Sequence, residues 1–269
     1  MPLYQYRLER VAKIFARHQV AVSDISLEVK SGERVALIGP SGAGKTTLFR
    51  MLNCTLRPSS GKLWINGDDT AKIHGGRLRE VRRTIGTIYQ QQNLVPRLKV
   101  VHNVLCGQLG CWSLLRSIAS LIRPTDMELA YGALKKVGIE EKIFSRTDEL
   151  SGGQQQRVAI ARVLVQDPEV ILADEPVSSV DPSLASTIVR LLIDISQSTG
   201  KTLMVNLHSV DLALSYFPRI IGIKNGSPLF DLTPDQVNEG LLNDLYSGHL
   251  PENGQESLPD ETSNLRVCS

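Results

Sequence analysis

The sequence predicts an α/β protein with a mainly parallel central sheet, an N-terminal antiparallel β subdomain and a helical subdomain. Three observations support this fold class. Apolar, β-branched runs at 33–39 and 169–175 have the composition of strands buried on both faces of a parallel sheet. Helical periodicity dominates between about 94 and 165. Before residue 38, mixed polar and apolar segments alternate with turn residues, which is typical of antiparallel strands.

Composition supports one large α/β domain or one domain with a sizeable insertion. The chain has 269 residues, of which 42% are hydrophobic and 22% charged, so it can bury a substantial core. Its formal net charge is +2, far from the concentrated basicity of a nucleic-acid-binding protein. The local basic cluster at 77–83 is best interpreted as a solvated helix face. We therefore expect no nucleic-acid partner.

The cysteines and the N-terminus limit where in the cell the protein is expected to work. The four cysteines show neither zinc-ligand spacing nor a plausible disulfide framework, so we expect a reducing compartment; they are Cys54, Cys106, Cys111 and Cys268. The first residues carry charges throughout and lack an apolar signal-peptide region, and no run of about 18 apolar residues occurs. We expect a chain that neither spans a membrane nor is exported by a signal peptide.

The first third of the chain predicts two antiparallel strands, a buried strand and a helix. The segments between residues 3 and 38 feed the apolar strand at 33–39 after the turn residues Ser31 and Gly32. Helical spacing follows at 46–54, where Leu48, Met51 and Leu52 share a face. A further strand and turn follow at 61–69.

The helical subdomain is expected at about 94–165, and two of its segments are informative. At 127–139 the spacing places four apolar residues on one face, before Gly138 as a C-cap; they are Leu129, Ala133, Leu134 and Val137. The stretch at 105–126 carries an apolar stripe of Trp112, Leu114, Leu115, Ile118 and Leu121. This stripe is either a loop and buried helix, or a surface helix that contacts a membrane-embedded partner.

The last third predicts strands at 169–175 and 202–208, an amphipathic helix at 182–199, another helix, and a hairpin at 219–230 that turns at Asn225–Gly226. Thr233 to Gln236 form a capping-box start for the last helix, with proline at the first helical position. We therefore expect one domain over residues 1–247. Residues 248–269 are rich in Pro, Glu, Ser and Asn and predict a disordered tail.

Residues 39–46, GPSGAGKT, match the phosphate-binding pattern G-x-x-x-x-G-K-[ST]. In such a loop, backbone N–H groups converge on phosphate oxygens, Lys45 reaches the terminal phosphates and Thr46 offers a hydroxyl to Mg²⁺. A strand precedes the loop and a helix follows it, as this chemistry requires. We therefore expect a P-loop NTPase core whose nucleotide contacts are Gly39, Pro40, Ser41, Gly42, Ala43, Gly44, Lys45, Thr46 and Thr47.

Two acidic residues are expected to complete this site. The buried strand at 170–173 delivers Asp174 and Glu175 at its carboxyl end, where ligands sit in open α/β sheets. Asp174 is expected to hold Mg²⁺ together with Thr46, directly or through water. Glu175 is positioned to accept a proton from an attacking water.

The segment LSGGQQQR at 150–157, about a hundred residues after the phosphate-binding loop, gives the chain a clear resemblance to the ATP-binding subunits of ABC transporters. Ser151, Gly152, Gly153 and Gln154 would present a hydroxyl and unhindered N–H groups at a helix N-terminus. The resemblance implies that this segment binds the γ-phosphate of ATP held by the opposite subunit. It therefore implies a head-to-tail homodimer that sandwiches two ATP molecules.

Matching positions suggest four more functional residues. Phe15 lies where the family keeps an aromatic that stacks on adenine, usually tyrosine. Gln90 matches the glutamine that contacts Mg²⁺ or the water, although Gln91 and Gln92 leave the register open. The segment 178–181, SSVD, departs from the commoner SALD but retains Asp181, which would lie near the partner's site. His208 matches the switch histidine that reaches the γ-phosphate.

The resemblance implies an ATPase that drives transport through separate transmembrane permease subunits, at the cytoplasmic face of the inner membrane. A periplasmic substrate-binding protein would take part indirectly. Residues 103–122 resemble the corresponding segment of phosphonate-importer ATPases, which favours phosphonate or a related phosphorus oxyanion as cargo. Polar amino-acid import and lipoprotein release or export remain alternatives.

Two further classes are less consistent with the sequence. ABC proteins acting on ribosomes or DNA normally carry two nucleotide-binding units or a long coiled coil, whereas this chain has one phosphate-binding loop and no heptads. A regulatory protein that binds ATP without hydrolysing it would be expected to lack Glu175 or His208, and both are present.

Overall fold

The chain folds around two sheets of different kinds, and the computed structural model describes residues 4–122, 124–178 and 180–247. The strands are β1 Tyr4–Ile14, β2 Val20–Lys30, β3 Arg34–Ile38, β4 Ser60–Ile65, β5 Asp68–Asp69, β6 Ile85–Ile88, β7 Val170–Asp174, β8 Thr202–Asn206, β9 Arg219–Lys224 and β10 Ser227–Leu232. The α-helices are α1 Lys45–Leu52, α2 Gly75–Arg83, α3 Val100–Leu105, α4 Leu114–Ile122, α5 Met127–Lys136, α6 Gly152–Gln166, α7 Pro182–Thr199, α8 Val210–Tyr216 and α9 Glu239–Tyr246. Short 3-10 helices are η1 Ala16–His18, η2 Cys106–Gln108, η3 Glu140–Lys142, η4 Thr147–Glu149 and η5 Pro234–Gln236.

The larger sheet confirms the mainly parallel architecture. Its six strands run in the order β10-β9-β3-β8-β7-β6, and every neighbouring pair except β9–β10 is parallel. Because the carboxyl ends of parallel strands meet at one edge, the residues that follow β3, β7 and β8 are brought together there. This edge is where the sequence placed its catalytic residues.

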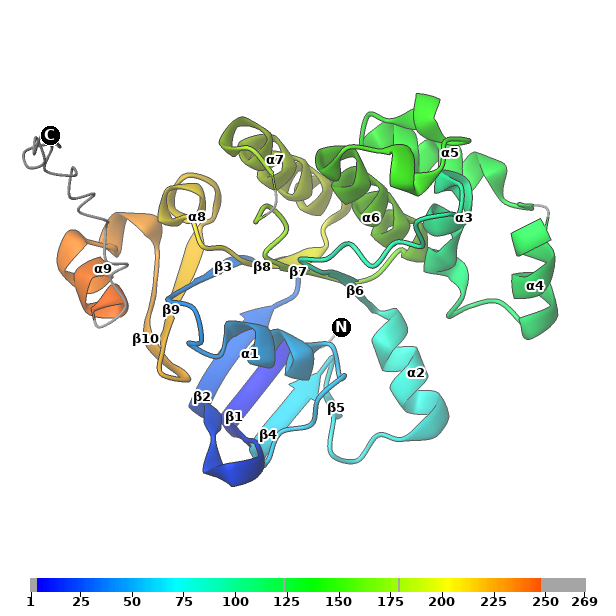
Figure 1. Ribbon diagram of the computed structural model, residues 1–269. Coiled ribbons are helices and arrows are strands. Elements are labelled where there is room, and N and C mark those ends of the chain that lie inside the picture. The colour runs from blue at the N-terminus through cyan, green and yellow to red at the C-terminus, as the bar shows by residue number, and fades with distance from the viewer. Residues whose placement is uncertain (1–3, 123, 179, 248–269) are drawn as a thin grey trace, which may run out of the picture.

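Alternate residues of the larger sheet face two separate hydrophobic cores, as the two-residue period of a strand requires. Val35 and Leu37 of β3 pack into a core shared with α1 and the N-terminal sheet, whereas Ala36 and Ile38 pack into a core shared with α3 and α5 to α8. Figure 1 shows α1 lying between the two sheets. The helix that follows the phosphate-binding loop is therefore fixed by burial on both sides.

The N-terminal sheet confirms the antiparallel prediction. It has four strands in the order β2-β1-β4-β5, and all its neighbouring pairs are antiparallel. β1 and β2 are longer than the short strands expected, with 11 residues each, because register shifts let them bend while they stay paired. The strand and turn predicted at 61–69 are β4 and β5.

Helices α3 to α6 gather at one end of the molecule, with α4 outermost (Figure 1). On α5, Ala133 and Leu134 are buried as expected, but Leu129 is 44% exposed and Ala130 takes the core position instead. The prediction for Leu129 was wrong because helical spacing alone does not fix which edge of an apolar stripe meets its neighbour. Gly138 follows α5 at φ 70°, in the left-handed conformation expected of a C-cap glycine.

α4 decides between the two interpretations of the stripe at 105–126. Leu114, Leu115 and Ile118 are 77%, 81% and 50% exposed, so the buried-helix interpretation is wrong for these residues. Trp112 instead packs partly against the core. Within the described residues, none of the helices combines the length and apolar character needed to cross a bilayer.

The C-terminal elements agree with prediction except at the last helix. α7 has the expected bounds, and β9 and β10 form the expected hairpin around Asn225–Gly226. The capping box at Thr233 and Gln236 is present, but it opens η5, and Asn238 caps α9 instead. A capping box is a one-turn motif, so it can open a single turn as well as a helix. The predicted tail, 248–269, lies outside the described residues.

Candidate active site

The phosphate-binding loop, residues 39–46, joins the carboxyl end of β3 to the N-terminus of α1. Two of its glycines have no room for a side chain. Gly39 has φ 149°, and a Cβ there would lie 2.1 Å from the carbonyl oxygen of Ile223. Gly44 has φ 100°, and a Cβ would lie 2.2 Å from the carbonyl oxygen of Ala21. β9 and β2 therefore press on the loop from outside and make glycine necessary at both positions.

Lys45 is held inside the loop. Its side chain is 4% exposed, and its ammonium donates hydrogen bonds to the carbonyls of Gly39 at 2.6 Å and Pro40 at 2.9 Å. Burial lowers the pKa of Lys45, and the charges of Glu175 and Asp174 oppose this effect. Burial and these two hydrogen bonds therefore restrict the Lys45 side chain to one position inside the curve of the loop backbone.

Asp174 ends β7 and is 8% exposed. One carboxylate oxygen, Oδ1, accepts a hydrogen bond from the Thr46 hydroxyl at 3.2 Å and another from the amide of Asn206 at 2.7 Å. Burial raises the pKa of Asp174, whereas these hydrogen bonds, first from Asn206 and then from Thr46, act to lower it. The structure therefore brings Thr46 and Asp174 together, as the sequence predicted.

Glu175 and His208 form a pair next to Asp174. Nε2 of His208 lies 2.6 Å from Oε1 of Glu175. Glu175 has φ 51°, a left-handed conformation that is unusual for this residue type and often marks functional sites. Its backbone N–H donates to the carbonyl of Asn206 at 3.2 Å. Both side chains line a cleft of ≈ 340 Å³, which Ser178 also lines.

The signature segment, residues 150–157, lies at the start of α6 in the helical lobe, which is formed by α3 to α6. Ser151 is the N-cap of α6, its hydroxyl accepts from the Gln154 N–H at 3.4 Å, and the Gln154 side chain accepts from the Ser151 N–H at 3.0 Å. Ser151 and Gly152 are exposed, and Gly153 is buried against Leu184. Among the described residues, no hydrogen bond or ion pair connects this segment to the phosphate-binding loop. One chain therefore does not join the two motifs by direct polar contacts.

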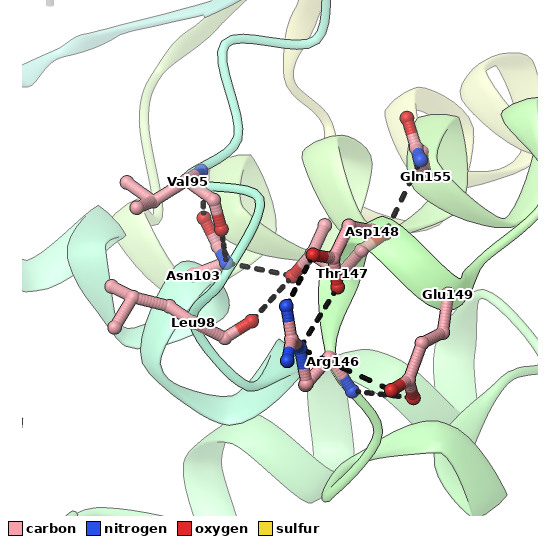
Figure 2. A network of polar contacts seen from close by, with 8 residues as sticks. All are labelled: Val95, Leu98, Asn103, Arg146, Thr147, Asp148, Glu149 and Gln155. Atoms are coloured by element: carbon pink, nitrogen blue, oxygen red, sulfur yellow. Dashed lines mark hydrogen bonds and ion pairs between the residues drawn. The ribbon is translucent and has the colours of Figure 1, made fainter.

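A polar network centred on the buried residues Asn103 and Thr147 fixes the chain just before this segment (Figure 2). The Asn103 amide on α3 donates to the Thr147 hydroxyl at 2.8 Å and exchanges hydrogen bonds with the backbone of Val95. The Thr147 hydroxyl donates to the carbonyl of Leu98 at 2.9 Å, and Gln155 of α6 donates to the carbonyl of Thr147 at 3.2 Å. The start of α6 is therefore tied to the segment that follows Gln90.

Gln90 itself follows β6 and is exposed. The segment after it is fixed by Arg162 of α6, whose guanidinium donates to the carbonyls of Gln92 and Asn93, each at 2.8 Å. These bonds place the stretch between the parallel sheet and the helical lobe. Whether Gln90 or a neighbouring glutamine contacts a ligand stays a prediction.

Phe15 and Asp181 lie at the margin of the site. Phe15 follows β1, is 37% exposed, and has the Lys13 ammonium 5.5 Å from its ring centroid. Asp181 is an exposed N-cap of α7 whose side chain makes no capping hydrogen bond. The Asp181 side chain has no hydrogen bond to the phosphate-binding loop within the described part of the chain. Their roles remain predictions.

Sequence reasoning missed two residues that shape the site. Asn206 hydrogen-bonds to Asp174, and Arg162 holds the segment after Gln90. The signal for Asn206 was a single amide at the end of an otherwise apolar strand. Arg162 carried no comparable signal, because a helical arginine usually faces solvent.

The chemistry of this edge of the sheet is specific. It combines a glycine-rich loop at a helix N-terminus, a buried ammonium, a hydroxyl next to a carboxylate, and a carboxylate paired with a histidine. Such a set can bind a chain of phosphates, hold a hard divalent cation through oxygen ligands, and activate water. Thr46 and Asp174 fit Mg²⁺ by donor type, since both offer oxygen ligands from adjoining elements.

Comparisons with known proteins agree with this chemistry. Residues 22–178 match the family model described as ABC transporter. The chain is 47% identical over 260 residues to the phosphonates import ATP-binding protein PhnC 2 of Pseudomonas aeruginosa (strain UCBPP-PA14), covering 97% of each protein. It is 40% identical over 240 residues to a protein of the same name from Halalkalibacterium halodurans, covering 89% of this chain and 98% of that protein.

Solved structures show the same architecture. A dimeric ATP-binding cassette in a post-hydrolysis state, bound to ADP and Pi, is 31% identical with a TM-score of 0.71, covering 85% of this chain and 98% of that one. The cbiO1 protein from Clostridium perfringens, part of the ABC transporter complex cbiONQ, is 28% identical with a TM-score of 0.76, covering 92% and 96%.

Proposed function

The chain belongs to the ABC transporter family and is an ATP-hydrolysing subunit, and from this premise we propose that it drives uptake of phosphonate or a related phosphorus oxyanion. The observation that carries the proposed cargo is the identity of 46% to 47% over 97% of two relatives named phosphonates import ATP-binding proteins. Polar amino acids, or lipoproteins released or exported, would require a different permease on the same ATPase.

The proposed hydrolysis uses the side chains at the carboxyl ends of β3, β7 and β8. The loop backbone and Lys45 bind the β- and γ-phosphates, and Thr46 and Asp174 hold Mg²⁺, which when bound neutralises phosphate charge. Glu175 accepts a proton from the attacking water, whose oxygen bonds to the γ-phosphorus as the bond to the β-phosphate breaks. His208, 2.6 Å from Glu175, orients that carboxylate and contacts the γ-phosphate.

The remaining contacts to ATP are proposed to come from other elements. Phe15 stacks on adenine, Gln90 senses the metal or the water, and Asp181 lies at the dimer interface. Ser151 to Gln154 bind the γ-phosphate held by a second copy of the chain. The separation of this segment from the phosphate-binding loop and the dimeric form of the related cassette support that arrangement.

A transmembrane permease is the proposed partner of the helical lobe. A groove of ≈ 580 Å³ lies between α2, η2 and α6, and the described residues that line it include four arginines and no carboxylate: Arg79, Arg82, Arg83 and Arg162. Arg82 and Arg162 donate to backbone carbonyls, and neither forms an ion pair with an acidic side chain in the described part of the chain. An acidic cytoplasmic segment of the permease fits this groove, and the exposed apolar face of α4 would extend the contact.

This partner would hold the protein peripherally at the cytoplasmic face of the inner membrane. The cargo would be delivered by a periplasmic substrate-binding protein, which this chain never touches. ATP binding would close the dimer, hydrolysis would reopen it, and the permease would follow.

Growth on a phosphonate as the sole phosphorus source tests the proposed function. A strain lacking this chain is complemented with the wild type or with Glu175→Gln, and growth on inorganic phosphate serves as the control. We expect the wild type alone to restore growth on phosphonate. Normal growth of the deletion strain on phosphonate would refute phosphonate as the cargo, but it would not contradict the assignment of the chain as an ABC ATPase.

A further inference from the structure

Asn206 is a buried amide at the end of an apolar strand. It is the last residue of β8, it is 0% exposed, and the three residues before it, Leu203 to Val205, are fully buried and apolar. Burying an amide is costly unless its hydrogen bonds are made, so such a position normally holds an apolar residue. The contacts of Asn206 should therefore explain its presence.

The side-chain amide and the backbone carbonyl of Asn206 contact the two consecutive acidic residues at the end of β7, Asp174 and Glu175. The Asn206 amide donates to Oδ1 of Asp174 at 2.7 Å, and its backbone carbonyl accepts from the Glu175 N–H at 3.2 Å. Asp174 and Asn206 are also direct partners in the parallel ladder between β7 and β8. One residue thus fixes a side chain and a main-chain group of consecutive acidic positions.

The amide of Asn206 is not fully satisfied. Within the described residues, its Oδ1 is buried and has no hydrogen-bond partner. A residue present only for packing would avoid this cost, because an apolar side chain of similar volume leaves no polar atom unpaired. An uncompensated polar group of this kind is expected where function, not stability, determines the residue.

We propose that Asn206 is a positioning residue for metal binding, an inference that rests on the proposed function. Both donors to Asp174, Thr46 and Asn206, bind the same oxygen, Oδ1, and no other described residue donates to Oδ2. Two donors on one oxygen hold the plane of the carboxylate and leave the second oxygen to a cation. Without Asn206, Thr46 alone would hold Asp174, and the carboxylate could rotate.

Nucleotide affinity measured with and without metal tests this role. The fluorescent analogue mant-ATP is titrated into the wild type, Asn206→Leu and Val205→Ala, once with Mg²⁺ and once with EDTA. Asn206→Leu keeps the number and branching of the side-chain heavy atoms and removes the donor. Val205→Ala disturbs the same buried strand without touching Asp174, so it reports the effect of a packing defect. Circular dichroism checks folding, and Asn206→Ala replaces Asn206→Leu if the latter fails to fold.

We expect the affinity of Asn206→Leu in EDTA to stay within about twofold of the wild type, and its affinity in Mg²⁺ to fall by about tenfold, the size of one hydrogen bond to a charged group. Val205→Ala should keep the full gain from Mg²⁺. Equal weakening in both conditions, or an unchanged gain from Mg²⁺, would overturn the inference. Failure of the wild type to bind mant-ATP at all would instead refute the proposed function.

Discussion

The catalytic edge of the sheet and the outer helix α4 are built in opposite ways. At the edge, Lys45, Asp174 and Asn206 are buried, and hydrogen bonds of 2.6 Å and 2.7 Å hold the Lys45 ammonium and join the Asn206 amide to Asp174. On α4, Leu114 and Leu115 are more than three-quarters exposed, although they are apolar. Buried polar groups at one site and exposed apolar groups at the other both cost stability, which indicates that each serves a ligand or a partner.

The catalytic edge and the helical lobe are nevertheless connected. Asn103 and Thr147 tie the segment after Gln90 to the start of α6 (Figure 2). Arg162 of α6 fixes the same segment and also lines the groove that contains the four arginines. A partner that moves this groove would therefore move the signature segment. We therefore propose that the buried edge of the sheet performs the chemistry and that the helical lobe couples it to the partner.

Of these variants, Lys45→Ala should have the largest effect, and it should act on the chemistry at the edge of the sheet. Removing the ammonium takes away the charge that stabilises the β- and γ-phosphates, so we expect ATP turnover to fall by at least about a hundredfold and ATP binding to weaken. Steady-state ATPase assays and nucleotide titrations measure both effects. Arg50→Ala removes an exposed cation from the same helix and should leave turnover unchanged. Normal turnover in Lys45→Ala would refute the assignment of the loop.

Leu114→Glu should leave ATP hydrolysis intact and disrupt the contact with the partner. Since Leu114 is 77% exposed, the variant should fold and hydrolyse ATP as the wild type does, but it should no longer co-purify with the permease. Leu229→Glu is the matched control, because Leu229 is an exposed apolar residue on β10, away from the helical lobe. A collapse of the circular-dichroism melt in Leu114→Glu would place α4 in the core and undo the contrast between the two regions.

Much of the catalytic edge could be predicted because its motifs are local. Gly39 to Thr46 carry their own turn chemistry, and Asp174 and Glu175 follow a continuous apolar run, so strand, loop and acidic pair all follow from neighbouring residues. The topology then brings them together, since parallel strands end at one edge. His208 also follows a strand, but its role was predicted from the resemblance to the family.

The features that the sequence did not predict correctly share one cause, because each depends on tertiary contacts. The hydrogen bond from Asn206 to Asp174 depends on β7 and β8 being neighbours, which nothing in either strand states. Leu129 was predicted to be buried, but Ala130 is buried instead. The direction of the neighbouring helix decides which of these two residues faces the core. The exposure of α4 could not be derived either, because the sequence shows an apolar face but not what covers it.

The most direct test of the central claim is whether the signature segment closes a dimer on ATP. Glu175→Gln should bind ATP without hydrolysing it and elute as a dimer in size-exclusion chromatography with magnesium-ATP. Adding Ser151→Arg to that variant should block the segment, so that the protein still binds ATP but elutes as a monomer. A dimer in both variants, or a monomer of Glu175→Gln in every condition, would contradict the claim.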